Sequence, residues 1–215
     1  MLICGIDEAG RGPVIGPLVV AGVCVTDENY LKRIGVKDSK KLSRKKREEL
    51  AVLIEKVSKI ETISLDAAEI DEFREILTLN QIEAGIFAKL IEKLTPDIVY
   101  VDAADANAQK FKEMIEERCS WKCQIISEHG ADARYAVVSA ASIIAKVQRD
   151  RAIDEIKAKV GIDFGSGYPS DPRTVRYIQN LIEKKMAVPA FVRKSWETVS
   201  NLKEEQGKKK LEEFE

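Results

Sequence analysis

The sequence of 215 residues predicts an α/β fold, a mixed β-sheet with helices on both faces. Two apolar runs typical of strands come first, at 2–6 and 19–25. The segment between them is too short for a helical crossover, so we expect an antiparallel hairpin. Later strand-like runs, at 60–65, 98–101 and 123–127, alternate with longer segments in which apolar residues recur at helical spacing.

Each predicted strand has its own pattern. The run at 2–6 is apolar and ends at two adjacent carboxylates, and the run at 19–25 is rich in valine. Polar and apolar residues alternate at 60–65, as in a strand with one solvated face. The run at 98–101 is short and apolar, which favours a buried strand. The fifth strand is predicted at 123–127.

The helices are predicted from caps and from apolar spacing. Ser43 caps the first of them and places Leu50 and Ile54 on one face. A long amphipathic helix is expected at 79–94. The remaining helices are predicted at 107–118, 137–160, 174–184 and 191–202.

Composition excludes several classes of protein. The 35 basic and 36 acidic residues give a net charge of −1, which argues against a protein that is basic throughout but allows a local basic patch. No apolar stretch approaches the ~20 residues of a membrane span, and the N-terminus does not have the features of a signal peptide. The scattered cysteines are expected to be thiols; a metal or redox pair at Cys119 and Cys123 is the alternative. We expect a cytoplasmic protein without membrane contact.

Carboxylates end two of the predicted strands. Asp7 and Glu8 end the first strand, and Asp102 ends the fourth in the same topological position. Because strand ends at one edge of an open α/β sheet converge on one crevice, these side chains are expected to meet. Asp132, before a long helix, is a candidate fourth carboxylate. Such an oxygen-only set suits Mg²⁺ or Mn²⁺, and two such ions promote phosphoryl transfer.

Simpler roles remain open for the acidic residues. A lone aspartate at a strand end is often a turn or cap residue. Asp105 competes with Asp102 for the inward position, and Asp132 alternatively caps a helix or pairs with Arg134. His129, the only histidine, is a possible proton shuttle, but a surface or loop histidine is the favoured interpretation. The acidic doublet followed by Gly-Arg-Gly is what favours a metal site.

Six sequence blocks occur in order along the chain. They are GIDEAGRGP at 5–13, DSKKL at 38–42, VDA at 101–103, ADARY at 131–135, VSAASIIAK at 138–146 and GSGYPSDP at 165–172. Together they resemble the type 2 ribonucleases H, the ribonuclease HII family, and their number and order make the resemblance specific. It implies a ribonuclease H-like fold with a five-stranded mixed sheet, in agreement with the strand pattern.

The resemblance also implies an activity. Members of the family are metal-dependent endonucleases that cut the RNA strand of RNA–DNA hybrids. They also cut 5′ of single ribonucleotides embedded in duplex DNA, leaving 3′-hydroxyl and 5′-phosphate ends, a role in DNA replication and repair. Asp7, Glu8, Asp102 and Asp132 resemble the family's four catalytic carboxylates, which bind two divalent ions, Mg²⁺ or Mn²⁺.

Further residues resemble the family's substrate contacts. Gly10-Arg11-Gly12 resembles the segment whose backbone groups reach the 2′-hydroxyl, the group that distinguishes RNA from DNA. Glycine suits this segment because a Cβ would block the approach. Tyr168 resembles the tyrosine that stacks on the sugar 3′ of the ribonucleotide; the alternative is a loop aromatic packed on Pro169.

Basic and polar residues supply weaker candidates. Lys40 and Lys41 are candidates for holding backbone phosphates, although most basic runs are solvated helix faces. Ser139, Ser142 and Lys146 lie on one side of a long helix. They are candidates for binding the scissile phosphate or for replacing metal-bound water, and Lys146 alternatively pairs with an acid.

Three parts are expected along the chain. Residues 1–165 form the catalytic domain, 166–205 a C-terminal helical cap and 206–215 a charged flexible tail. In that tail, Leu211 and Phe214 resemble the apolar anchors of peptides that bind sliding clamps, although the glutamine and second aromatic expected there are absent. A disordered tail is the alternative. The chain is expected to be a monomer.

Two other functions remain open. A catalytically inert nucleic-acid-binding adaptor would recruit partners through the tail, but it would have no reason to keep four mutually repelling carboxylates. A junction-resolving nuclease of the same superfold is the other alternative; the Gly-Arg-Gly turn and Tyr168 favour the ribonuclease.

Overall fold

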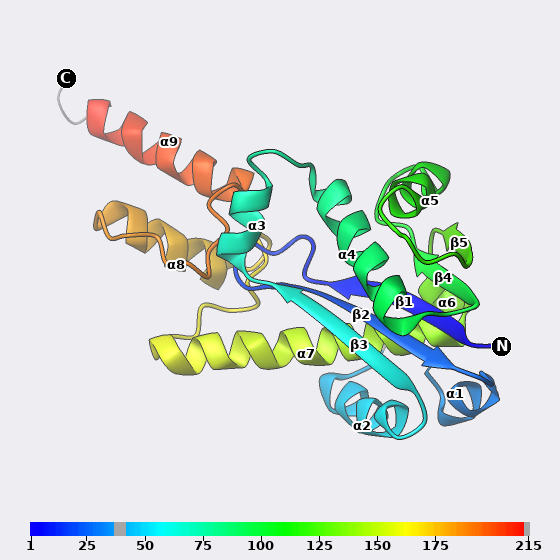
Figure 1. The fold of residues 1–215 in the computed structure, drawn as a ribbon. Helices are drawn as coiled ribbons and strands as arrows, with labels where there is room; N and C mark the ends of the chain where they lie inside the picture. The colour runs from blue at the N-terminus through cyan, green and yellow to red at the C-terminus, as the bar shows by residue number, and fades with distance from the viewer. Residues whose placement is uncertain (37–41, 213–215) are drawn as a thin grey trace. The chain divides into compact units, whose positions relative to one another are not determined.

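The structure, a computed structural model, describes residues 1–36 and 42–212 (Figure 1). Lys40, Lys41 and Phe214 lie outside the described residues, so the contacts predicted for them stay predictions. The chain forms two compact units. The first comprises 1–9, 19–64 and 77–148, and the second comprises 10–18, 65–76 and the chain from 149 onward.

The first unit is built on a five-stranded sheet in the order β3-β2-β1-β4-β5. Its strands are β1 (Ile3–Ala9), β2 (Leu18–Val25), β3 (Lys59–Leu65), β4 (Ile98–Asp102) and β5 (Gln124–Glu128). β1 pairs antiparallel with β2 and parallel with β4, and β4 pairs parallel with β5. The predicted mixed sheet and its first hairpin are therefore confirmed.

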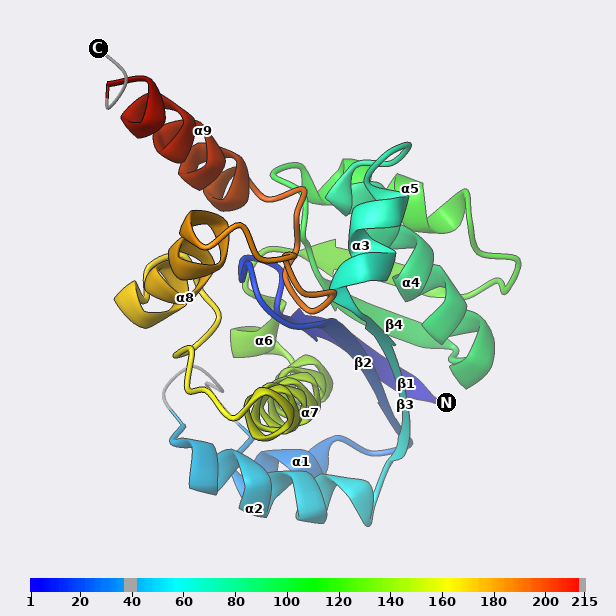
Figure 2. The same ribbon diagram turned by 90° about the vertical axis from the view of Figure 1, so that its left-hand side faces the viewer.

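Helices cover both faces of this sheet (Figure 2). One face carries α1 (Asn29–Ile34), α2 (Arg44–Glu55) and the first half of α7 (Ala136–Val160), and the other carries α4 (Leu79–Leu94) and α5 (Ala108–Glu116). The Ser43 hydroxyl accepts a hydrogen bond from the Lys46 N–H (3.2 Å), as expected of the predicted cap. Neither α1 nor α6 (Ala131–Arg134) was predicted.

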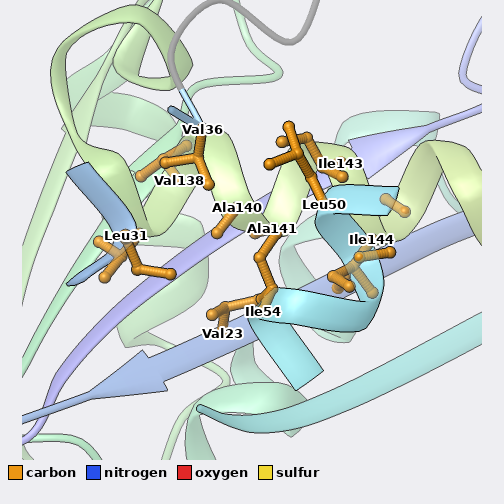
Figure 3. Close-up of a cluster of buried hydrophobic side chains, with 14 of the residues drawn as sticks. Val23, Leu31, Val36, Leu50, Ile54, Val138, Ala140, Ala141, Ile143 and Ile144 are labelled. Atoms are coloured by element: carbon orange, nitrogen blue, oxygen red, sulfur yellow. The ribbon is translucent and has the colours of Figure 1, made fainter. Parts of the chain in front are cut away.

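An aliphatic core joins the sheet to α1, α2 and α7 (Figure 3). Val23, Leu31, Ile54 and Ala141 meet there and are fully buried. Each large aliphatic side chain buried in this way contributes about 1.5–3 kcal/mol to folding. Gly5 lets α7 lie directly on β1, because a Cβ at this position would be 2.2 Å from the backbone of α7. The helix is thereby held close to the strand that carries Asp7.

The second unit contains α3 (Ala67–Phe73), the second half of α7, α8 (Pro172–Glu183) and α9 (Glu197–Glu212). α8 and α9 pack against each other (Figure 1). The segment 10–18 belongs to this unit because the N–H groups of Val14 and Ile15 donate to the Gly167 carbonyl (2.8 and 3.1 Å). In sequence order, the last stretch of this unit begins after residue 148. The predicted division into a catalytic domain up to 165 and a helical cap from 166 stays a prediction.

The last helix also differs from its prediction. It begins at Glu197 rather than 191 and continues through Glu212, into the segment expected to be a flexible tail. No helix among residues 1–36 and 42–212 is long and apolar enough to span a membrane. All four cysteines are free thiols, three of them buried and Cys123 half-buried.

Candidate active site

Three carboxylates come together where β1 and β4 end. The parallel register pairs Ile6 with Val101, so Asp7 and Asp102 are the next residues on neighbouring strands. One oxygen from each of Asp7, Asp102 and Asp132 lies within 4.8 Å of the other two. The structure thus brings together three of the four carboxylates that the sequence singles out.

The short helix α6 carries Asp132 to the end of β4. The Asp102 carboxylate accepts hydrogen bonds from the backbone N–H groups of Gly130 (2.8 Å) and Ala131 (3.2 Å), at the start of α6. Gly130 makes the turn into the helix with a φ of 66°, a conformation that glycine adopts readily. Asp102 therefore fixes the segment that holds Asp132.

Burial makes Asp7 a weaker acid than an exposed aspartate. Its side chain is almost fully buried, and its pKa is raised to about 6, mainly by this burial and to a smaller extent by the negative charge of Asp102. The Lys146 ammonium and a hydrogen bond from Ser142 oppose the shift but do not cancel it. A buried group of carboxylates is most favourable when a cation compensates their charge. This donor set fits a divalent metal ion.

Ser142 and Lys146 connect to Asp7 from α7. The Lys146 ammonium donates a hydrogen bond to the Ser142 hydroxyl, which in turn donates one to the Asp7 carboxylate. The sequence suggested these residues as contacts to phosphate or water. The structure shows them in contact with Asp7, and Lys146 is near enough to that acid to favour its ionised form.

Ser139 has a different environment, although it lies one helical turn from Ser142. Its hydroxyl is buried and has no hydrogen-bond partner among the described residues. It lines a cavity of about 240 Å³ together with Asp132, Lys32 and Arg134. An unpartnered hydroxyl in a cavity beside the carboxylates can donate to an oxygen of a bound molecule.

Glu8 does not belong to the group of three carboxylates. Its backbone N–H donates to the Asp7 carboxylate (2.8 Å), but successive strand residues point to opposite faces of a sheet. Its role as a metal ligand therefore stays a prediction. Among the described residues, the carboxylate group joins Asp7 and Asp102 on neighbouring strands, and it does not include both of the adjacent residues Asp7 and Glu8.

Two other sequence candidates are Asp105, in the loop after β4, and His129, which lies close to that loop. Asp105 accepts hydrogen bonds from the Asn107 N–H (2.8 Å) and from the Asn80 side chain, so it organises the loop, while Asp102 joins the carboxylate group. His129 is exposed, and its Nε2 lies 3.2 Å from the Ala106 carbonyl oxygen. This is the environment of a loop histidine.

In the second unit, the Gly-Arg-Gly turn lies against Tyr168. A Cβ on Gly10 would be 2.4 Å from the Pro17 carbonyl oxygen, and its φ of 94° also requires glycine. A Cβ on Gly12 would fit, 3.7 Å from the Tyr168 ring. The Arg149 guanidinium lies over the same ring, 5.1 Å from its centroid. The tyrosine is thus held by a cation–π contact while 39% of it stays exposed.

Sequence reasoning missed Arg193, which holds this turn from inside the second unit. Its guanidinium is fully buried and donates hydrogen bonds to the carbonyl oxygens of Gly10, Arg11 and Gly16. The only local signal is the basic pair Arg193-Lys194 directly after the apolar pair at 191–192. Its partners are about 180 residues away in sequence, so no local pattern reveals them.

Known proteins match the chain along almost its whole length. The family model of Ribonuclease HII matches residues 4–199. Ribonuclease HII of Methanosarcina barkeri is 49% identical over 216 residues, which cover 95% of this chain and 96% of the relative. The crystal structure of the ribonuclease H2 from Pyrococcus horikoshii OT3 has a TM-score of 0.89 at 41% identity, covering 97% of this chain and 100% of that one.

A third match is the ribonuclease of the PCNA:RNase HII complex from Archaeoglobus fulgidus, with a TM-score of 0.87 and 47% identity over 93% of this chain and 96% of that one. These matches confirm the ribonuclease H-like fold predicted from the sequence, and with it a hydrolytic endonuclease active on RNA–DNA. The chain belongs to the ribonuclease HII family.

Proposed function

We propose that this chain cuts the RNA strand of RNA–DNA hybrids and also cuts duplex DNA 5′ of a single embedded ribonucleotide. The products would carry 3′-hydroxyl and 5′-phosphate ends. The observation that supports the proposal best is the grouping of Asp7, Asp102 and Asp132 at one end of the sheet. This activity would serve the removal of ribonucleotides from DNA during replication and repair, in the cytoplasm.

The carboxylates are the proposed ligands of two divalent ions, Mg²⁺ or Mn²⁺. Oxygen ligands suit both ions, and Asp7, Asp102 and Asp132 offer them in a compact, largely buried group. Glu8 is the proposed fourth ligand on the family resemblance alone, because it lies outside the group of three. When bound, the ions would activate a water molecule and stabilise the leaving 3′-oxygen.

The chain's own residues prepare this site. Ser142 and Lys146 hold the Asp7 carboxylate and favour the ionised form that a metal requires. Asp102 keeps α6 in place through its two backbone hydrogen bonds. The Ser139 hydroxyl is available to donate to a phosphate oxygen or to a water molecule in the cavity beside Asp132.

Recognition of the ribonucleotide is assigned to the second unit. The backbone of Gly10-Arg11-Gly12 would contact the 2′-hydroxyl, and the Tyr168 ring would stack on the sugar that follows. The small space between Gly12 and the ring supports this assignment, since a side chain on Gly12 would point at Tyr168. On sequence alone, Lys40 and Lys41 would hold phosphates, which positions a duplex without reading its sequence.

A sliding clamp is the proposed protein partner. The relative from Archaeoglobus fulgidus was solved in a complex with PCNA. In this chain Leu211 lies within α9, and it would act as a clamp anchor together with Phe214. We propose that the chain is otherwise a monomer.

The direct test is a cleavage assay on duplex DNA that contains one ribonucleotide, in Mg²⁺, Mn²⁺ or EDTA. An all-DNA duplex and the Asp102→Asn protein are the controls. We expect one metal-dependent cut 5′ of the ribonucleotide, which is absent from both controls. Binding without any cut would favour an inert adaptor, and cleavage of a ribonucleotide-free four-way junction would favour a resolvase.

A further inference from the structure

Arg193 makes an unusual set of contacts for a charged side chain. It is fully buried, and its three nitrogens each donate to a different backbone carbonyl: Nε to Gly16 (3.0 Å), Nη1 to Arg11 (3.1 Å) and Nη2 to Gly10 (2.5 Å). A buried charge is expensive unless it is fully hydrogen-bonded. All three carbonyls belong to the segment 10–18, so the guanidinium closes this loop on itself.

Trp196 contacts both Arg193 and the Gly-Arg-Gly turn. Its ring lies 4.6 Å from the Arg193 guanidinium, and its Nε1 donates to the Gly12 carbonyl (3.3 Å). The guanidinium of Arg74, the residue directly after α3, lies 5.5 Å from the centre of the same ring. Together, Arg193 and Trp196 hold the carbonyls of all three residues of the Gly-Arg-Gly turn.

The segment that carries Arg193 is itself fixed by α3. The Asp71 carboxylate accepts hydrogen bonds from the backbone N–H groups of Lys194 (2.7 Å) and Ser195 (2.9 Å), which follow Arg193 directly. The Arg193 N–H donates to the Val14 carbonyl (2.8 Å) in the loop. The backbone that carries the guanidinium is therefore held at both sides by hydrogen bonds within the second unit.

We propose that Arg193 is a positioning residue for ribonucleotide recognition. By fixing the carbonyls of Gly10 and Arg11, it holds the turn in the one conformation in which the backbone can meet a 2′-hydroxyl. Arg193 thereby sets the preference for ribose over deoxyribose without touching the substrate. The inference rests on the proposed contact between the Gly-Arg-Gly turn and the 2′-hydroxyl.

Only an arginine can make this set of contacts. Its planar fork directs several N–H groups in fixed directions, whereas a lysine ammonium is a single point on a flexible stem and cannot reach three separate carbonyls. Arg193→Lys keeps the positive charge but releases at least part of the turn. Trp196→Phe is a milder variant, because it keeps an aromatic ring, although a smaller one, and removes the N–H that reaches Gly12.

The test measures binding to two duplexes that differ by one 2′-hydroxyl, by fluorescence anisotropy in EDTA so that no cleavage occurs. We expect Arg193→Lys to lower the ratio of the two affinities roughly fivefold, as for loss of about one hydrogen bond, with the affinity for all-DNA duplex nearly unchanged. Trp196→Phe should lower the ratio about twofold. Ile178→Val, in the core of the same unit but outside these contacts, is the control for general destabilisation.

The possible outcomes distinguish a failure of the role proposed for Arg193 from a failure of the role proposed for the Gly-Arg-Gly turn. If Arg193→Lys and Trp196→Phe lower the melting temperature but bind with the wild-type ratio, the support is merely structural and the inference is wrong. If the wild-type protein itself shows no preference for the ribonucleotide duplex, the proposed role of the turn fails, and the inference fails with it. Should Arg193→Lys not fold, Trp196→Phe carries the test alone.

Discussion

The Asp102 carboxylate accepts a hydrogen bond from the backbone N–H of Gly130 at 2.8 Å, two residues before Asp132. Asp102 thus belongs to the carboxylate group and also anchors the segment that supplies another member of it. The two tasks need different properties of the same side chain. The negative charge would serve the proposed metal ion, whereas the hydrogen bond needs only an acceptor oxygen.

Asparagine and alanine at position 102 separate these tasks. Asp102→Asn keeps an acceptor for Gly130 and Ala131, so we expect a stable fold with almost no metal-dependent cleavage. Asp102→Ala leaves both N–H groups without this partner, which should lower the free energy of unfolding by a further ~1–3 kcal/mol. Urea denaturation and a cleavage assay measure the two effects. Cleavage by Asp102→Asn at the wild-type rate would remove Asp102 from the catalytic set.

The second prediction is that Asp7→Asn stabilises the protein in the absence of metal. Folding raises the pKa of Asp7 from 3.8 to about 6, so the ionised carboxylate is unfavourable in the native state at neutral pH. A shift of this size corresponds to at most about 3 kcal/mol, which the neutral amide would recover. Cleavage should be lost in the same variant. Thermal unfolding in EDTA at pH 7 makes the comparison.

The pH dependence has a definite sign. Between 3.8 and about 6 the native protein holds the Asp7 proton more tightly than the unfolded chain, so the contribution of Asp7 to stability falls as the pH rises. Above this range the contribution is constant. Asp7→Asn should remove this part of the slope. A slope that is identical in the wild-type and Asp7→Asn proteins would contradict the assignment.

The two glycines of the Gly-Arg-Gly turn should respond differently to alanine. Gly10→Ala places a Cβ 2.4 Å from the Pro17 carbonyl oxygen at a φ of 94°, so we expect a loss of stability of more than about 1 kcal/mol. Gly12→Ala fits sterically and should melt like the wild type, but its methyl group faces Tyr168 and should impair cleavage at a single ribonucleotide. Melting temperatures and cleavage rates distinguish them. Wild-type cleavage by Gly12→Ala would argue against a close backbone approach at this residue.

Replacing Tyr168 tests the stacking role. Tyr168→Ala removes the ring that Arg149 supports, and we expect cleavage at an isolated ribonucleotide to fall roughly fivefold or more. A long RNA–DNA hybrid should be affected less, because it offers many positions for cleavage. Tyr168→Phe keeps the ring and serves as the control. Equal losses on both substrates would count against a contact with one particular sugar.

Deleting residues 208–215 tests the clamp hypothesis. Val199 of α9 belongs to the buried core of the second unit, and it lies well before the deleted residues. Intrinsic cleavage should therefore stay intact. Binding to the PCNA of Archaeoglobus fulgidus, followed by size-exclusion chromatography, should be lost. Phe214→Ala in the full-length chain should weaken this binding as well. A collapse of cleavage after the deletion would show that the C-terminal segment is part of the fold.

Elements with a strong local pattern could be predicted from the sequence. α4 has the bounds expected from its apolar spacing, and Ser43 caps α2 as predicted. α6 was missed because four residues cannot show a helical period. α9 extends beyond its prediction because its second half consists largely of glutamate and lysine, good helix formers that form no apolar face.

The candidate site divides in the same way. The meeting of Asp7 with Asp102 could be predicted because Asp7 lies near the end of β1 and Asp102 ends the neighbouring parallel strand β4. The sequence offered the pairing of Lys146 with an acid as an alternative, but it could not name Asp7 or the part of Ser142, because these contacts depend on how closely α7 lies on β1. Arg193 was the hardest residue to predict. Its hydrogen-bond acceptors are backbone carbonyls near the other end of the chain, and the sequence around Arg193 does not indicate them.

The hydrogen-bonded chain from Lys146 through Ser142 to Asp7 has a consequence for how metal ions enter. Lys146 acts as a resident counter-ion, which keeps the carboxylates assembled before any metal arrives. The same positive charge repels an incoming metal ion, so Lys146 offsets part of the electrostatic attraction between the three carboxylates and that ion. We therefore expect a preassembled but loosely binding centre, whose ions exchange with the surrounding pool between turnovers instead of staying as permanent constituents.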